Sequence, residues 1–160
     1  MTAKYAIVTP YYREAPFVLR RCVDSVKNQT VSVEHFLISD GVPQVFPSHV
    51  RHIALDKPHS DYGGTPRSIG SILAMSEGFA GIGFLDADNW LEPNHVEQCL
   101  RRPDESVIHF PSEPTDAHVD TSRLFFLRGC FHMLPLWVTM PKEASTVGGD
   151  RFFYQALAKD

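Results

Sequence analysis

The chain has 160 residues, of which 43% are hydrophobic and 21% charged, and its formal net charge is −4 at pH 7. That length is typical of one domain with its own core. The acidic balance, with no run of Lys and Arg, argues against nucleic-acid binding. Because no apolar stretch is long enough to span a membrane and the N-terminus is unlike a secretory signal, we expect a soluble, cytosolic protein.

The first part of the chain alternates between short apolar runs and helical patterns. Residues 5–8 form an apolar run, which predicts a buried strand. Pro16 then begins a segment with apolar residues at helical spacing, and residues 35–38 form a second apolar run. A strand–helix–strand unit of this kind predicts a parallel sheet.

The rest of the chain adds further predicted elements. A weaker strand is predicted near residues 52–55, and a helix follows from the helical spacing of Ile69, Ile72, Leu73, Ser76 and Phe79. Pro93 marks the start of another helix. Three more strands are predicted over residues 82–85, 107–110 and 124–127, and a short terminal helix over 151–159.

These elements predict one α/β domain over residues 1–160, with a mainly parallel central sheet flanked by helices. Residues 1–110, approximately, have the alternating pattern of a nucleotide-binding half. Residues 111–160 read as a less regular half that could shape a second substrate site, and no convincing linker separates the two.

Polar side chains follow three of the predicted strands. The first strand ends in residues 9–13 (TPYYR), the second in 39–41 (SDG) and the fourth in 86–89 (DADN). In an open parallel sheet, ligands bind outside the carboxyl ends of the strands. We therefore expect these three segments to open onto one cleft.

Asp86 and Asp88 are the candidate metal ligands. Two carboxylates separated by one residue beyond a strand can face one hard cation such as Mg²⁺ or Mn²⁺, which also bridges to substrate phosphates. The alternative is a turn, in which Asp residues are common. The buried strand before the pair favours the metal site.

Three residues are candidates for binding a nucleoside. The Asp40 carboxylate suits the N–H edge of a uracil. Tyr11 could stack on the base, and Thr9 could form a hydrogen bond to it. Turn formation by Asp40 and strand-end packing by Thr9 and Tyr11 are equally open alternatives.

Arg67 and Asp150 complete the candidate site. The guanidinium of Arg67, which follows a Gly-rich loop, is shaped to pair with a phosphate; the alternative is a surface residue in the first turn of a helix. Asp150 could take a proton from an acceptor hydroxyl as a general base, or it could be the N-cap of the last helix.

Five segments together resemble the inverting glycosyltransferases of family 2, which have the GT-A fold. They are residues 9–13 (TPYYR), 25–30 (SVKNQT), 39–42 (SDGV), 66–70 (PRSIG) and 84–89 (FLDADN). The resemblance runs from about Tyr5 to Leu100, with a weaker similarity from Leu124 to Leu157.

The resemblance implies roles for the candidate residues. Thr9, Tyr11 and Asp40 would hold the nucleoside. Asp88 would bind Mn²⁺ or Mg²⁺, and Asp86 would contact the metal or the ribose.

The resemblance also implies roles for the two remaining candidates. Arg67 would lie near the diphosphate or the base, and Asp150 would be the catalytic base. The sequence departs from the family pattern at Ser39 and Ser68, where the family has Asp and Asn, and at Gly149, where it has Glu.

The function expected from the sequence is metal-dependent, inverting transfer of a sugar from a nucleoside diphosphate sugar, with a UDP-sugar favoured, to the hydroxyl of an unknown acceptor. One alternative is a catalytically inactive nucleotide-sugar-binding protein or partner subunit. A sugar nucleotidyltransferase is less favoured, because residues 11–13 lack the glycines typical of its phosphate loop.

Overall fold

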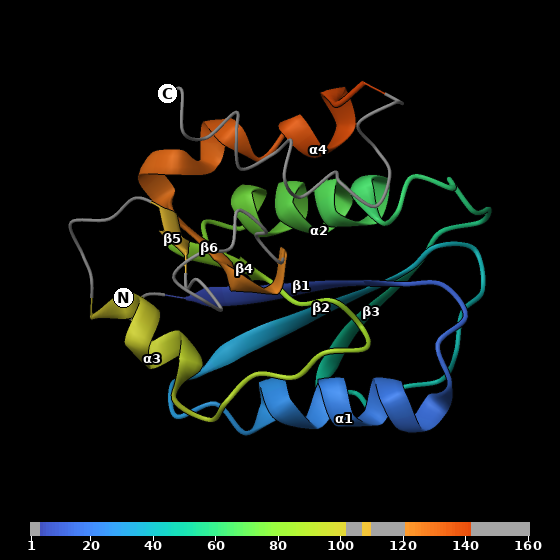
Figure 1. Ribbon diagram of the computed structural model, residues 1–160, viewed down its shortest axis with the longest axis horizontal. Coiled ribbons are helices and arrows are strands. Elements are labelled where there is room, and N and C mark those ends of the chain that lie inside the picture. Colours follow the sequence, from blue (N-terminus) through green and yellow to red (C-terminus); the bar gives the residue numbers. More distant parts are fainter. Residues whose placement is uncertain (1–3, 102–106, 110–120, 142–160) are drawn as a thin grey trace, which may run out of the picture.

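The computed structural model describes residues 4–101, 107–109 and 121–141, in which six strands form one sheet (Figure 1). Their order across the sheet is β3-β2-β1-β4-β6-β5. The strands are β1 (Tyr5–Tyr11), β2 (Val33–Ser39), β3 (Val50–Ala54), β4 (Gly81–Phe84), β5 (Val107–His109) and β6 (Leu124–Leu127).

Four neighbouring strands, β3, β2, β1 and β4, are parallel. β1 pairs with β2 and with β4, so that Val8 lies opposite Phe36 on one side and Phe84 on the other. β3 continues the parallel arrangement beside β2. β6 runs antiparallel to both β4 and β5. The predicted mainly parallel α/β sheet is therefore confirmed.

Helices cover both faces of this sheet. Figure 1 shows α1 and α3 on one face, and α2 and α4 on the other. The helices are α1 (Pro16–Lys27), α2 (Gly64–Ser76), α3 (His95–Leu100) and α4 (Leu136–Thr139), with 3₁₀ turns at η1 (Thr121–Arg123) and η2 (Arg128–Met133). Among the residues described, no helix is both long and apolar enough to cross a membrane.

The alternation of side chains along β1 divides the core into two layers. Ala6 and Val8 pack on the α2 side of the sheet, whereas Ile7 packs against Cys22 and Val96 on the α1 side. Successive strand residues point to opposite faces, so every second residue contributes to the same layer. A central strand buried on both faces explains the uninterrupted apolar run seen in the sequence.

The buried face of α2 is not the face that its apolar residues would predict. Ile72 is 55% exposed, whereas the buried residues of the helix are mostly small or polar: Gly64, Pro66, Arg67, Ser68, Gly70, Ser71 and Ala74. The helix lies so close to β1 that a Cβ added at Gly70 would be 2.5 Å from Cγ1 of Val8. This face of α2 is buried because its small residues let the helix lie close to the sheet, and not because it is apolar.

Candidate active site

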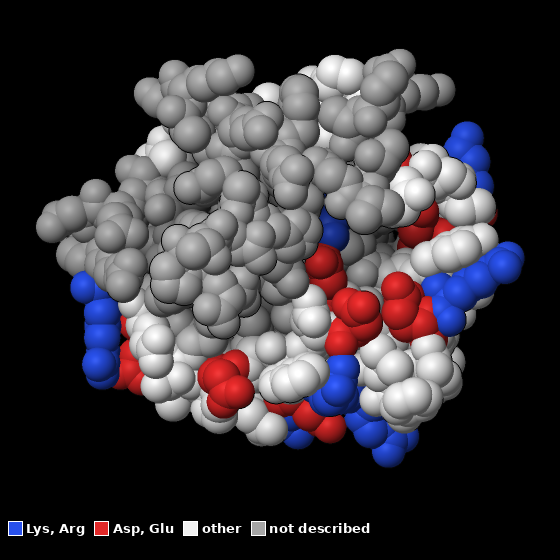
Figure 2. All heavy atoms as spheres, in the orientation of Figure 1, with Lys and Arg blue, Asp and Glu red and all other residues white. Residues whose placement is uncertain are grey.

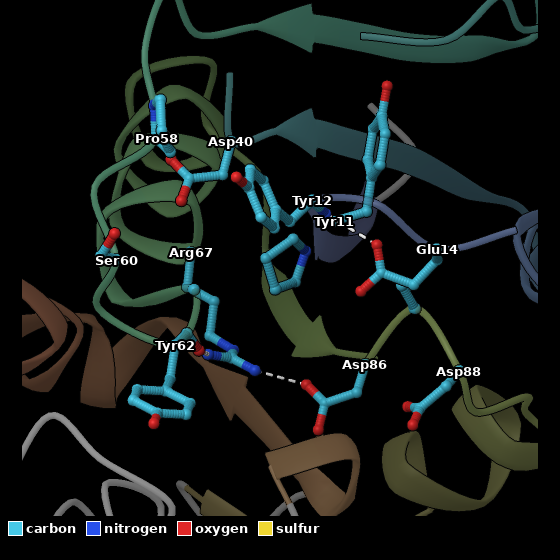
Figure 3. A pocket seen from close by; sticks show the side chains of 13 residues that line it. Tyr11, Tyr12, Glu14, Asp40, Pro58, Ser60, Tyr62, Arg67, Asp86 and Asp88 are labelled. Carbon is cyan, nitrogen blue, oxygen red and sulfur yellow. Dashed lines mark hydrogen bonds and ion pairs between the residues drawn. The ribbon is translucent and has the colours of Figure 1, made fainter. Parts of the chain in front are cut away.

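A cleft of about 500 Å³ opens at the carboxyl ends of the parallel strands (Figure 3). Figure 2 shows acidic side chains gathered on one face of the molecule. The residues that line the cleft are Pro10, Tyr11, Tyr12, Glu14, Asp40, Pro58, Ser60, Tyr62, Gly63, Arg67, Asp86, Ala87 and Asp88. The three predicted strand ends therefore meet at one edge of the sheet.

The segment after β4 carries Asp86 and Asp88 to the cleft. β4 and Leu85 are buried, Asp86 is partly exposed and Asp88 is exposed. The chain therefore passes from the core to the surface over the residues that carry the two carboxylates. A turn follows, in which the Asn89 amide donates to the Asp86 carbonyl at 2.9 Å. Both carboxylates line the cleft (Figure 3).

Two polar side chains of α1 and one just beyond its end hold this segment in place. Arg21 donates to the backbone carbonyl of Asp88 at 2.5 Å, and the Ser25 hydroxyl accepts the Leu91 amide at 3.1 Å. Gln29 donates to the Glu92 carbonyl at 2.8 Å. Residues four apart lie on one face of a helix, so Arg21 and Ser25 of α1 both face the carboxylate segment, and Gln29 contacts it from just beyond the end of the helix.

Arg67 is a largely buried residue in the wall of the cleft. Its side chain is 8% exposed and is ion-paired with Asp86, and it also donates to the Tyr62 carbonyl at 2.7 Å. Its guanidinium lies 5.0 Å from the ring centroid of Trp137, an arrangement that favours a cation–π contact. Arg67 is therefore not an exposed cation of the first helical turn, and it fixes the orientation of the Asp86 carboxylate.

The loop before α2 is shaped to receive this guanidinium. Ser60, Tyr62 and Gly63 have positive φ angles of 56°, 53° and 86°. Positive φ is unfavourable for residues with a Cβ and is concentrated at functional sites. A Cβ at Gly63 would lie 2.9 Å from a terminal nitrogen of Arg67, so glycine meets both the angle and the space.

Asp40 lies across the cleft from Asp86 (Figure 3). Its carboxylate accepts hydrogen bonds from His59, at 3.1 Å from the backbone amide and 2.7 Å from Nδ1. Because a carboxylate is only an acceptor, Nδ1 of His59 carries the proton. His59 was not predicted from the sequence, because it lies 19 residues away from Asp40 on a loop with no motif to mark it.

The structure places Thr9 away from the cleft. Its side chain is fully buried on the α1 side of β1, with the hydroxyl 2.9 Å from Nε2 of His35 and 3.9 Å from Sγ of Cys22. The expected contact of Thr9 with a base conflicts with this position, because the strand alternation turns the hydroxyl into the core.

Tyr11 lines the cleft, but its ring is held by other residues. Its hydroxyl is 2.8 Å from Nε2 of His52 and accepts the Gln44 amide at 2.8 Å, and Phe46 packs edge-on at 5.6 Å. Stacking of this ring on a base would require it to leave these partners. The neighbouring Tyr12, which the sequence analysis did not select, is more exposed and also lines the cleft.

The cleft fits a hard divalent cation. Both Asp86 and Asp88 line it, and Mg²⁺ and Mn²⁺ are commonly held by one or two carboxylates together with waters and substrate phosphates. The described part of the chain contains no group of three or more metal-binding side chains. Asp88 is the more accessible ligand, since Asp86 is already paired with Arg67. The candidate base, Asp150, lies outside the described residues.

Comparisons with known proteins agree with this arrangement. No protein-family model matches the chain. The chain is 32% identical over 105 residues to chondroitin synthase of Pasteurella multocida (strain Pm70), a match that covers 60% of the chain and 10% of that protein. The resemblance to the glycosyltransferases is confirmed.

Solved structures show the same fold. S. aureus TarS 1-349 in complex with UDP-GlcNAc matches with a TM-score of 0.64 at 12% identity, covering 94% of the chain and 52% of TarS. The mannosyltransferase PcManGT from Pyrobaculum calidifontis, in complex with GDP-Man and Mn²⁺, matches with a TM-score of 0.63 at 14% identity, covering 97% and 52%. The chain thus has the GT-A fold, and it spans about half the length of these structures.

Proposed function

We propose that the chain is the catalytic domain of an inverting, metal-dependent glycosyltransferase of family 2 that uses a UDP-sugar. The observation that carries this proposal is the meeting of Asp40, Asp86 and Asp88 in one cleft at the strand ends. An open α/β sheet binds nucleotides at this edge. TarS in complex with UDP-GlcNAc and PcManGT in complex with GDP-Man and Mn²⁺ support a nucleotide-sugar donor.

Asp40 is the proposed contact for the uracil. A carboxylate has about four lone-pair sites, and the hydrogen bonds from His59 fall mainly on Oδ1 of Asp40. Oδ2 receives only the shared bond from the His59 amide, which leaves it capacity to accept the N3–H of a uracil. Tyr12, at the mouth of the cleft, is the more accessible aromatic side chain for packing on the base.

Asp88 and Asp86 would hold the cation at the diphosphate. A bound Mn²⁺ or Mg²⁺ supplies Lewis-acid stabilisation of the negative charge that develops on the leaving diphosphate. Arg67 keeps the Asp86 carboxylate in one orientation, and α1 fixes the backbone of Asp88 through Arg21. Such prearranged groups need little reorganisation during the reaction.

Asp150 is the proposed general base. It would take the proton of an acceptor hydroxyl, whose oxygen forms a bond to the anomeric carbon from the side opposite the diphosphate. The bond between that carbon and the diphosphate oxygen breaks in the same displacement, and the configuration inverts. In this proposal residues 1–160 form one domain, with the donor bound by residues 1–110 and the acceptor side built by residues 111–160.

The Asp88→Asn substitution tests the metal site. Replacing one of two carboxylate ligands should weaken Mn²⁺-dependent binding of UDP at least tenfold, measured by calorimetric titration with and without Mn²⁺. Because Asp88 is exposed, the melting temperature should stay within about 2 °C of the parental value. Glu92→Gln, an exposed acidic residue that does not line the cleft, is the matched control and should bind UDP normally.

Three outcomes would contradict parts of the proposal. Unchanged UDP affinity in Asp88→Asn would remove the metal site. A chain that binds UDP-sugars with Mn²⁺ but neither hydrolyses nor transfers them would be the inactive binder. Asp150→Asn separates donor binding from the chemistry, because it should keep donor affinity and lose transfer; transfer at the parental rate would place the base elsewhere.

A further inference from the structure

Trp90 is an exposed aromatic residue beside the proposed metal site. Its side chain is 54% exposed, although a Trp ring carries a large apolar surface that is favourable to bury. It follows Asp88 by two residues, on the segment that leaves the cleft. The cleft described above does not include Trp90, so the donor site alone does not account for it.

The indole is held next to the carboxylate segment. The guanidinium carbon of Arg21 lies 4.2 Å from the centroid of the Trp90 ring, and the same guanidinium donates to the backbone carbonyl of Asp88. One charged group thus links the indole directly to the end of the cleft. The next residue, Leu91, is buried and its amide is bonded to Ser25 of α1.

This arrangement leaves a fixed ring surface accessible to a ligand. An aromatic surface on a constrained backbone loses little conformational entropy when a ligand packs on it. The electron-rich face of an indole attracts polarised C–H groups, which cover the flat faces of pyranose rings. Exposed Glu92 and Asn94 follow the ring in sequence, and such polar side chains are suited to the hydroxyls at the edge of a sugar.

We propose that Trp90 forms an acceptor subsite that binds a saccharide by stacking. The inference rests on the proposed function, which places the cation and the diphosphate of the donor at Asp88. It adds Trp90 to the acceptor side proposed for residues 111–160, and it names the acceptor class as a carbohydrate chain. A saccharide whose terminal hydroxyl faces the donor at Asp88 would continue along the segment that carries Trp90. The indole therefore binds acceptor and does not take part in the chemistry.

A direct binding experiment tests this subsite without assuming the acceptor. The full chain, loaded with UDP and Mn²⁺, is applied to a printed array of oligosaccharides of neutral hexoses, hexosamines and uronic acids. The strongest binder is then titrated while tryptophan fluorescence is recorded. The chain has two Trp residues, and Trp137 is only 5% exposed, so a ligand-dependent change in quenching by acrylamide reports on Trp90.

Three variants distinguish the loss of stacking on Trp90 from the loss of any exposed apolar side chain. Trp90→Ala should weaken saccharide binding about tenfold, the upper range for one aromatic contact, whereas Trp90→Phe should stay within about threefold. Ile72→Ala is the matched control, because Ile72 has nearly the same exposure, 55%, on α2 at the opposite face of the sheet. It should bind like the parent.

The outcomes distinguish this inference from the proposed function. If UDP with Mn²⁺ binds but no oligosaccharide does, or if Trp90→Ala binds saccharide as well as the parent, the subsite is overturned while the donor site stands. If UDP itself does not bind, the proposed function fails first. Binding of Trp90 to a protein partner and to no saccharide would also overturn the inference.

Discussion

Arg67 joins α2 and the loop before it to two segments that are distant in sequence. It belongs to α2, pairs with Asp86 after β4, donates to the loop carbonyl of Tyr62 and lies over Trp137 of α4. A buried cation is tolerated only when its hydrogen-bonding capacity is largely used. Removing it would leave the Asp86 carboxylate without this partner and a space beside the indole.

We therefore expect Arg67→Ala to lower the free energy of unfolding by about 2 kcal/mol, measured by urea denaturation. Breaking a fully buried ion pair costs about 3–5 kcal/mol, and the 31% exposure of the Asp86 side chain reduces that figure. Arg101→Ala is the control, because its pair with Glu97 is on the surface and should contribute less than about 1 kcal/mol. Equal effects of the two substitutions would show that Arg67 is not a structural centre of the site.

At the scale of elements, the contact between α2 and β1 determines how the helix lies on the sheet. Gly70 faces Val8 so closely that a methyl group at that position would overlap its Cγ1. Intrinsic helix propensity favours Ala over Gly by about 1 kcal/mol, whereas overpacking costs about 1–3 kcal/mol. Because the overlap is with a β-branched side chain of a central strand, we expect packing to dominate.

Gly70→Ala should accordingly destabilise the fold by about 1–2 kcal/mol, measured by chemical denaturation. Adding Val8→Ala should make the Gly70→Ala change less harmful than it is alone, which a double-mutant cycle would detect as a coupling. Ser76→Ala, at an exposed position of the same helix, is the control and should be neutral or slightly stabilising. A stabilising Gly70→Ala would mean that α2 can move away from the sheet.

The sequence predicted most elements, because the strands are uninterrupted apolar runs and Pro16 marks the start of α1. It did not predict the buried face of α2, since that face is chosen by the space above Val8 and not by apolar spacing. The strand-end rule located Asp40, Asp86 and Asp88 at one cleft. Partners such as Arg21 and Asp88, 67 residues apart, could not be found, because the crossing of α1 over that segment is a tertiary property.

At the scale of the whole molecule, the order of the strands creates the site. β1 lies between β2 and β4, so the ends of these three strands, which are spread over about half the chain, meet at the same edge of the sheet. The same arrangement buries His35 of β2 next to Thr9 of β1, with 2.9 Å between Nε2 and the Thr9 hydroxyl. In the described part of the chain, Nδ1 of His35 has no hydrogen-bond partner.

This buried imidazole should make the stability of the fold depend on pH. Burial lowers the pKa of His35 from 6.5 to about 3, with a smaller contribution from the charge of His49. Well above pH 6.5 His35 is neutral in both the folded and the unfolded state and adds no pH dependence. As the pH falls from 6.5 towards 3, only the unfolded state binds the proton, so stability is lost by up to about 1.4 kcal/mol per pH unit.

The His35→Gln variant isolates this contribution. Burial also lowers the pKa of His52 and His95, but both residues are present in the parent and in the variant, so their effects cancel in the comparison. The variant should be less stable at pH 7.5, where it loses native packing. The difference between the parent and the variant should then shrink by about 2 kcal/mol between pH 7.5 and 5, measured by urea unfolding at each pH. A constant difference across this range would show that His35 is accessible to protons in the folded chain, and that the strand order does not seal this layer of the core.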